Sequence, residues 1–268
     1  MTDFVQGLIL GAVQGITEWL PISSEGVNTL VQINLFDEPV AEAIAISIWL
    51  HLGTLLAAIV YFRRELWVLI HRFLGYVTGT PEGRSFNLNV PISFLVISTL
   101  LTGVLGAPLF VYGLNEKEIP AMEMTMIIGG LLIVTGILQR FTAGFAASRT
   151  RPGTKDAVLL GVVQALSVFP GLSRSGLTVS ALLFRGYEAI QAIRLSFLMS
   201  IPVVLAAEIG LALIDGIEFN LVVIAGVLTA FVLGLLTISL LIRIATRVAF
   251  WKFCVVLGII SLFSPLFA

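Results

Sequence analysis

Long runs of apolar residues follow one another along most of the chain, and short polar segments separate them. A helix that crosses the hydrocarbon core of a bilayer needs about 20 predominantly apolar residues. Six runs reach that length, so the pattern predicts an all-α membrane protein with six transmembrane helices. The predicted helices cover residues 41–62, 90–113, 120–139, 190–214, 219–242 and 248–267.

Two further apolar runs are shorter, and each ends at a proline. Residues 4–20 lead into LPISSEG, and residues 156–169 lead into FPGLSRSG. Runs of this length are typical of re-entrant segments, which enter the bilayer and turn back on the same side. Irregular backbone at their tips is tolerated only when it is buried in protein or lines a wet cavity. We therefore predict two re-entrant helical hairpins in addition to the six spans.

The basic residues support this layout, because short cytoplasmic loops collect Lys and Arg. If both hairpins return to their own side, thirteen of the 15 basic residues share one side, Lys117 lies opposite, and Arg174 lies in the second tip. We expect a multi-pass protein of the cell membrane with both termini on the exterior. The mixed apolar and basic segment 66–79 predicts either a helix along the cytoplasmic interface or a solvated loop. The acidic residues on the side of Lys117 are Asp37, Glu38, Glu42, Asp215 and Glu218.

The chain also resembles itself at an offset of 150 positions. GLILGAVQGITEWLPISSEG at 7–26 aligns without a gap with AVLLGVVQALSVFPGLSRSG at 157–176, and the identities include the polar residues Gln14 and Ser23. Chance explains matches of Leu, Val and Gly more readily than these polar matches. Each half holds one hairpin and three spans, so the second copy is inverted and the two tips meet near the bilayer midplane. We predict one membrane domain over 1–268, with repeats at approximately 1–145 and 151–268.

Composition narrows the classes of function. Hydrophobic residues make up 58% of the chain and charged residues 12%, whereas soluble domains carry about 25% charged residues. A soluble globule with a single core is therefore excluded. The net charge of -1 provides no global basic field, so nucleic-acid binding is excluded as well.

The first tip carries acidic and hydroxyl groups. Gln14 and Glu18 lie one helical turn apart and share a face. A carboxylate in a lipid-buried segment is costly and usually faces a cavity or a charged partner. Ser23, Ser24 and Glu25 then supply two hydroxyls and a second carboxylate where a helix should begin. A structural ion pair of Glu18 and ordinary helix capping are the alternative interpretations.

The second tip has the residues of a phosphate-binding loop. Gly171 gives the backbone conformational freedom, and the amides that follow it are the first of a helix. The guanidinium of Arg174 can hold two phosphate oxygens through two hydrogen bonds. Thr178 follows Arg174 by four residues and shares its face. An Arg that serves as a structural counter-ion or reaches for the membrane interface is the alternative. The predicted binding set is Ser23, Ser173, Ser175, Gly176 and Thr178.

Two other polar residues lie within predicted spans. His51 stands in the middle of the first span, where it could titrate or line a cavity, but a packing hydrogen bond between helices is the favoured interpretation. Glu208 falls near an exterior helix end, and we expect it to reach water or a neighbouring helix.

Three segments, QGITEWLPISSEG, HLGTLLAAIVYFRREL and PGLSRSGLT, resemble in this order the undecaprenyl-pyrophosphate phosphatase family of membrane lipid phosphatases. The resemblance covers the whole chain. It implies an inverted repeat with paired re-entrant segments, an exterior-facing site, and functional residues at Gln14, Glu18, Ser23, Ser24, Ser173, Arg174 and Thr178. Family members typically carry a His where this chain has Val27. Either another group replaces that His, with Glu25 the nearest candidate, or hydrolysis is impaired.

The resemblance implies hydrolysis of a polyprenyl diphosphate lipid to the monophosphate and inorganic phosphate. The predicted catalytic residues are Glu18, Ser24, Glu25 and Arg174. Ser24 is the candidate nucleophile with Glu18 or Glu25 as its base, and a metal-bound water is the alternative nucleophile. Gln14, Glu18 and Glu25 offer oxygen ligands for Mg²⁺ or Ca²⁺.

A transporter or scramblase of a lipid phosphate is the rival interpretation, because inverted repeats with broken helices are typical of transporters. Contact with membrane lipids is expected in either case. The sequence predicts no oligomeric state.

Overall fold

The computed structural model describes residues 3–78, 90–112, 119–142, 149–214, 216 and 220–266. These residues form helices joined by turns, and no β-strand occurs among them. Four residues used in the charge argument lie outside the described part of the chain: Arg84, Lys117, Asp215 and Glu218.

Five long apolar helices confirm five of the predicted spans. Their lengths of 21 to 26 residues correspond to at least about 31 Å at 1.5 Å per residue, which matches the hydrocarbon thickness of a bilayer. Large apolar side chains such as Leu100, Val104 and Leu236 are exposed on their outer faces, as expected of helices in contact with lipid. The chain is thus an integral, multi-pass membrane protein. The helices are α3 (Val40–Tyr61), α5 (Ile92–Tyr112), α6 (Ala121–Thr142), α9 (Ala189–Ile214) and α10 (Leu221–Ala245).

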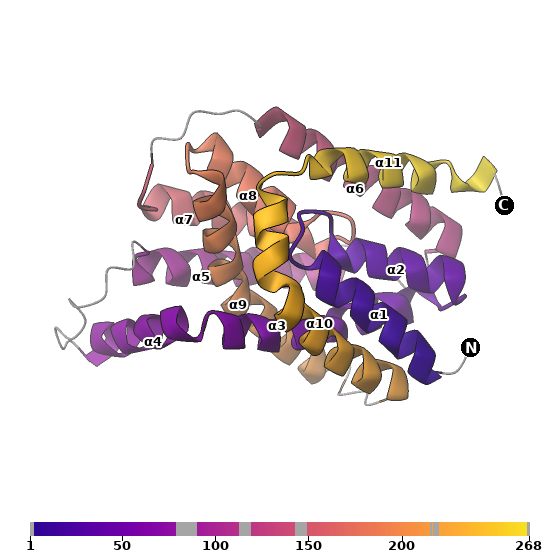
Figure 1. Ribbon diagram of the computed structural model, residues 1–268, viewed down its shortest axis with the longest axis horizontal. Helices are drawn as coiled ribbons and strands as arrows, with labels where there is room; N and C mark the ends of the chain where they lie inside the picture. The colour runs from indigo at the N-terminus through magenta and orange to yellow at the C-terminus, as the bar shows by residue number, and fades with distance from the viewer. Residues whose placement is uncertain are drawn as a thin grey trace.

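The last predicted span, 248–267, is shorter in the structure. Helix α11 (Phe250–Leu262) has 13 residues, or about 20 Å, because a turn precedes it and the short 3-10 helix η3 (Ser264–Leu266) follows. It packs closely along α6 (Figure 1). A Cβ atom at Gly129 would lie 2.7 Å from the carbonyl oxygen of Gly258. Glycine at this position therefore allows the two backbones to touch.

The segment after α3 forms helix α4 (Arg63–Thr78). Of the two interpretations of 66–79, the structure shows the helix for the part that it describes.

Both short apolar runs form helical hairpins. The first consists of α1 (Asp3–Thr17) and α2 (Ser24–Leu35), and the second of α7 (Thr154–Ala165), the 3-10 helix η2 (Leu166–Val168) and α8 (Arg174–Phe184). The base of each hairpin is closed by a polar contact, which shows that the chain returns to the level where it started. Gln6 Nε2 donates to Glu38 Oε1 at 2.8 Å in the first hairpin. Arg185 Nε donates to Asp156 Oδ1 at 2.7 Å in the second.

Each hairpin packs against a long helix of the other half. Helix α1 lies along α10, and α7 lies along α5 (Figure 1). Both contacts depend on glycine: a Cβ atom at Gly7 would lie 2.5 Å from the Val222 carbonyl oxygen, and one at Gly161 would lie 2.9 Å from that of Ser98. Because each hairpin packs against a helix of the other half, the two hairpin tips meet in the interior of the protein.

Candidate active site

The first tip reverses the chain within six residues. Helix α1 ends at Thr17, the turn contains Pro21, and Ser23 adopts a left-handed backbone conformation with φ of 63°. Such a conformation is uncommon for a residue other than glycine and is held only where the surroundings require it. The Ser23 Oγ accepts a hydrogen bond from the Gly26 N–H at 3.3 Å and so caps the start of α2.

The second tip is built in a similar way. Gly171 has a φ of 103°, and a Cβ atom there would lie 2.8 Å from the carbonyl oxygen of Ile128, so both conformation and space require glycine. Ser173 Oγ accepts from the Gly176 N–H at 3.0 Å and caps α8. Helix capping, the alternative interpretation of the first tip, is therefore part of what Ser23 does, and Ser173 caps α8 in the same way.

The two tips interlock through polar contacts. The Gly171 N–H donates to Ser23 Oγ at 3.2 Å, and Ser175 Oγ donates to the Leu20 carbonyl oxygen at 3.2 Å. These bonds join segments about 150 residues apart in sequence and place the starts of α2 and α8 beside each other. Two helix N-termini that meet in this way favour an anion between them.

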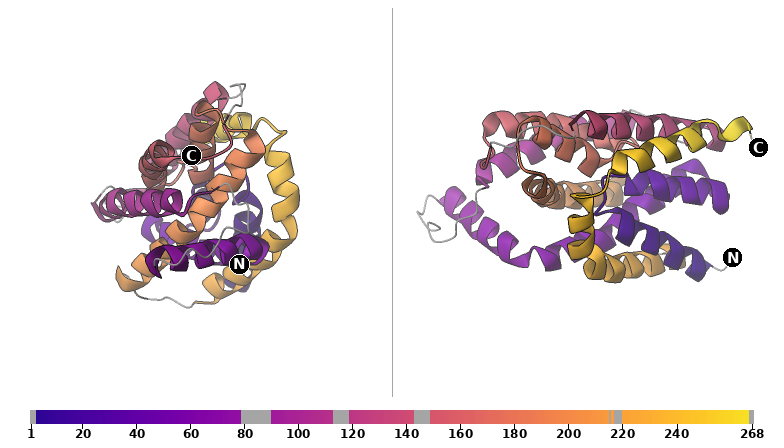
Figure 2. Two further views of the ribbon diagram at one scale, coloured as in Figure 1. Left: turned by 90° about the vertical axis from the view of Figure 1, so that its left-hand side faces the viewer. Right: turned by 45° about the horizontal axis from the view of Figure 1, so that its top comes forward.

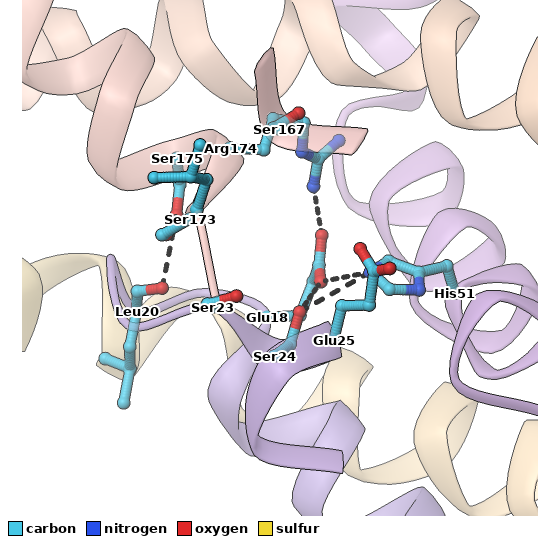
Figure 3. A pocket seen from close by; sticks show the side chains of 11 residues that line it. Glu18, Leu20, Ser23, Ser24, Glu25, His51, Ser167, Ser173, Arg174 and Ser175 are labelled. Carbon is cyan, nitrogen blue, oxygen red and sulfur yellow. Dashed lines mark hydrogen bonds and ion pairs between the residues drawn. The ribbon is translucent and has the colours of Figure 1, made fainter. Parts of the chain in front are cut away.

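The Glu18 carboxylate lies at the centre of the meeting point (Figure 3). Its Oε1 is paired with the Arg174 guanidinium. Its Oε2 accepts from the Ser24 hydroxyl at 2.6 Å and from Gln14 Nε2 at 3.1 Å, and it lies 3.3 Å from His51 Nε2. A buried carboxylate with this many donors is suited to the ionised form. The structural ion pair considered for Glu18 is thus present, and it lies within a pocket.

Arg174 keeps one hydrogen-bonding group unused. Its Nη2 is bonded to Glu18, whereas its Nη1 is buried and has no hydrogen-bond partner among the described residues. Buried donors without a partner are rare in native proteins, because the desolvation cost is not recovered. The guanidinium therefore offers a donor to a ligand in the pocket.

The pocket has an empty volume of about 300 Å³ and is lined mainly by polar side chains. Seven of the predicted site residues line it, and they come from both tips. The complete lining is Glu18, Leu20, Ser23, Ser24, Glu25, His51, Ser167, Leu172, Ser173, Arg174 and Ser175.

Three predicted residues lie outside this lining. Gln14 stands behind Glu18: its amide nitrogen donates to Glu18, and its oxygen accepts from Asn28 Nδ2 at 2.8 Å. The Gly176 N–H is bonded to Ser173. Thr178 is fully buried and contacts the Arg174 carbonyl oxygen at 2.8 Å. These residues support the pocket lining, and their predicted roles in binding remain predictions.

Sequence reasoning missed two polar residues of the pocket. Helix packing was the favoured interpretation of His51 and cavity lining the weaker alternative, yet its ring lies in the pocket, with Nε2 3.5 Å from Ser24 Oγ and Nδ1 2.8 Å from the Ser47 carbonyl oxygen. The signal was its depth in a span, because ionisable groups at such depth usually face the interior of the protein. Ser167 was missed because it lies before the second tip, although it aligns with the polar Thr17 at the repeat offset.

An apolar chamber opens beside the pocket. Its empty volume is about 1220 Å³ with the space at its mouth, and Glu25, His51, Ser167 and Arg174 line both cavities. Most of its wall comes from α5 and α9. Glu208 lines the chamber with 4% of its surface exposed, and neither of its carboxylate oxygens has a hydrogen-bond partner among the described residues. Glu208 was expected to reach water or a neighbouring helix. Its burial excludes open water, because α9 turns this residue inward, where His51 of α3 lines the same chamber.

The pocket provides few protein ligands for a metal ion. No group of three or more His, Cys, Asp or Glu side chains suited to a metal occurs among the described residues. Two carboxylates, those of Glu18 and Glu25, line the pocket together with the Ser24 hydroxyl. This set fits an ion such as Mg²⁺ that takes one or two carboxylates and completes its shell with phosphate oxygens and water.

Comparison with known proteins shows the family to which the chain belongs. The family model described as "Bacitracin resistance protein BacA" matches residues 7–263. An undecaprenyl-diphosphatase of Methanococcoides burtonii is 48% identical over 268 residues, which cover 98% of this chain and 99% of the relative. An undecaprenyl-diphosphatase of Haloarcula marismortui is 38% identical, with 96% of each chain covered. The resemblance noted in the sequence is thus confirmed, and the chain belongs to the BacA family.

Proposed function

We propose that this protein is a membrane phosphatase of the undecaprenyl-diphosphatase type. It hydrolyses a polyprenyl diphosphate to the monophosphate and inorganic phosphate, and so recycles the lipid carrier used for cell-surface glycan synthesis. One observation carries the proposal: Arg174, which has an unused Nη1 donor, lines a pocket that is also lined by hydroxyl groups from the starts of α2 and α8. The names of the full-length relatives support it.

The two cavities match the two parts of such a lipid. The polar pocket suits a diphosphate, and the adjoining chamber suits an apolar chain. Glycines widen the chamber: Gly103 on α5 and Gly210 on α9 line it, and a Cβ atom at either would meet nothing within 4 Å. Because Arg174 lines both cavities, a lipid with its chain in the chamber has its phosphates within reach of the guanidinium.

The site residues have different roles in the proposed hydrolysis. Arg174 binds the terminal phosphate and stabilises the charge that spreads over its oxygens in the transition state. Ser24 attacks the phosphorus, and its hydroxyl proton passes to Glu18, to which it is already bonded at 2.6 Å. Gln14 orients Glu18. Ser23, Ser173 and Ser175 shape the two tips, and Gly176 and Thr178 hold the start of α8 in place.

A divalent cation, Mg²⁺ or Ca²⁺, is part of the proposal. Glu18 and Glu25 would hold it together with phosphate oxygens, and it would neutralise negative charge on the diphosphate. Gln14 fits a ligand role less well, because its oxygen already accepts a hydrogen bond from Asn28.

The proposed topology has six crossings, two re-entrant hairpins and an inverted repeat in one membrane domain. Helices α11 and η3 complete the sixth crossing, since they continue along α6. The start of α1 and the end of α11 lie at the same end of the molecule (Figure 1 and Figure 2), as an even number of crossings requires. The helix starts support the proposed repeat: α1, α2 and α3 begin at residues 3, 24 and 40, and α7, α8 and α9 begin at 154, 174 and 189. In this proposal, both termini and the site lie on the exterior.

Transport of a lipid phosphate without hydrolysis is the second candidate, favoured by the combination of a polar pocket and an apolar chamber between two repeats. Phosphate release from a long-chain prenyl diphosphate by detergent-purified protein with Mg²⁺ separates the two functions. We expect release by the intact protein and a loss of at least about 100-fold for Arg174→Ala. Arg194→Ala is the matched control, because Arg194 pairs with Glu65 in an exposed position. If the intact protein releases no phosphate, the phosphatase proposal is wrong and lipid-phosphate transport remains as the candidate function.

A further inference from the structure

The end of α6 lies beside the start of α11, outside the candidate active site. The two helices pack along each other in opposite directions (Figure 1). A Cβ atom at Gly136 would lie 2.8 Å from the Trp251 carbonyl oxygen, so the two backbones touch here. This contact places the first turn of α11 next to the last two turns of α6. Arg140 of α6 and Lys252 of α11 are therefore neighbours of the same tryptophan.

Both basic side chains lie close to the ring of Trp251. The guanidinium carbon of Arg140 is 5.6 Å from the ring centroid, and Lys252 Nζ is 5.8 Å from it. A tryptophan ring attracts cations at such distances. It thereby gathers two like charges, which repel each other. Both side chains are long and exposed, so their charged ends can turn to a common anion that offsets this repulsion.

No acidic side chain balances these charges. Neither Arg140 nor Lys252 forms an ion pair with another of the described residues. The sequence contains no Asp or Glu from 124 to 155 or after 218, which includes the end of α6 and all of α10 and α11. Arg243, in the last turn of α10, and Arg247, in the turn that follows, are exposed basic residues as well. The excess of positive charge favours an anionic ligand from outside the chain.

The surroundings suit a lipid better than a free anion. Tryptophan is enriched where membrane helices meet the lipid headgroups. Phe141 and Phe253 directly follow the two basic residues in the sequence, and 75% and 44% of their surfaces are exposed. A phospholipid can therefore place its headgroup phosphate on the basic side chains and its acyl chains on the phenylalanines.

We propose that Arg140, Trp251 and Lys252 form a site for the headgroup of an anionic phospholipid. Basic pockets between helices on the cytoplasmic side of membrane proteins bind such headgroups, and this end of α6 and α11 is cytoplasmic in the proposed topology. The inference goes beyond the proposed function and does not depend on hydrolysis.

The lipid site adjoins two contacts that hold the first hairpin tip. Gln139 Nε2 donates to the Pro21 carbonyl oxygen, and Cys254 Sγ donates to the same oxygen at 3.6 Å. A headgroup bound to Arg140 and Lys252 holds α6 and α11 together beside these contacts. A ligand that binds only the folded state stabilises it. Anionic phospholipid should therefore raise the temperature of thermal unfolding.

Titration of the detergent-purified protein with short-chain phosphatidylglycerol, with bound lipid counted by native mass spectrometry, tests the inference. The first phosphatidylglycerol should bind at least about 10-fold more tightly than phosphatidylcholine of the same chain length. The double variant Arg140→Gln/Lys252→Gln should lose at least about 10-fold in this affinity. Arg64→Gln/Lys155→Gln is the matched control, because it removes one exposed arginine and one exposed lysine from α4 and α7. The control should bind phosphatidylglycerol as tightly as the intact protein.

Two further measurements separate this site from a general attraction of lipid to basic residues. Trp251→Leu keeps an apolar side chain but removes the aromatic ring, and it should weaken the binding of phosphatidylglycerol at least about 3-fold. Phosphatidylglycerol should raise the unfolding temperature of the intact protein and of the control. It should not raise that of Arg140→Gln/Lys252→Gln.

Four results overturn the inference. Equal affinity for the two phospholipids shows that the site does not recognise negative charge. Equal affinity, or an equal rise in unfolding temperature, in the double variant and its control shows that lipid does not bind at this cluster. Unchanged affinity of Trp251→Leu shows that the ring takes no part. Displacement of the lipid by inorganic phosphate at the same concentration shows that the site takes a free anion. The proposed phosphatase activity is measured separately, as phosphate release.

Discussion

Glu18 and Arg174 lie 156 positions apart in the sequence and form an ion pair inside the protein. Each residue comes from the tip of a different helical hairpin, and each hairpin packs against a long helix of the other half. The pair therefore exists only when both halves are folded together. It links the packing of the two hairpins directly to the chemistry of the pocket.

The charge of Glu18 is expected to be essential. Glu18→Gln removes the acceptor for the Ser24 proton and leaves Arg174 without its counter-charge. Turnover should fall at least about 100-fold. Glu65→Gln, which removes a carboxylate from an exposed pair with Arg194, is the control and should change turnover little. Near-normal turnover of Glu18→Gln, measured as phosphate release, would place the proton acceptor elsewhere.

The width of the chamber should determine how well a long prenyl chain binds. Gly103→Leu places a side chain in the chamber without a clash of its Cβ atom. We expect a higher KM for a long-chain prenyl diphosphate and an unchanged KM for a short-chain one. Gly130→Leu is the matched control, because Gly130 also has no neighbour within 4 Å but does not line the chamber. Equal effects on both substrates would show that the chain binds elsewhere.

Asp156 should stabilise the base of the second hairpin in a pH-dependent way. Burial raises the pKa of its carboxyl, but hydrogen bonds from the Gly153 N–H, Arg185 and Tyr187 outweigh burial and hold the pKa below its usual value. A lowered pKa stabilises the folded state above the unfolded value of about 4, and this stability is lost as the pH falls through the folded value. Asp156→Asn should therefore cost about 1–3 kcal/mol at pH 7.

Thermal unfolding of both proteins between pH 3 and pH 7 measures this effect. The difference between the intact protein and Asp156→Asn should be largest at pH 7 and should shrink below about pH 4. A difference that does not depend on pH would indicate a packing role for Asp156.

The sequence was sufficient for those parts of the fold that depend on long apolar runs and on turn residues. Five spans and both hairpins follow from run length, and the contact of Glu18 with Arg174 agrees with the expectation that the two tips meet. The length of α11 did not follow, because an apolar run does not show where a turn will interrupt it. His51 was assigned to packing because its neighbours come from α2 and from the first tip, and a single sequence does not show which face of α3 meets them.

Binding of a non-hydrolysable prenyl methylenediphosphonate, measured as a Kd in detergent, tests the central claim most directly, because it separates recognition of the diphosphate from turnover. Arg174→Ala removes the unused donor, and it should weaken binding at least about 10-fold, as expected for a lost charge-assisted hydrogen bond. Arg194→Ala should bind as tightly as the intact protein. Equal affinity of Arg174→Ala and the intact protein would contradict the account, since the diphosphate would then not lie between the two hairpin tips.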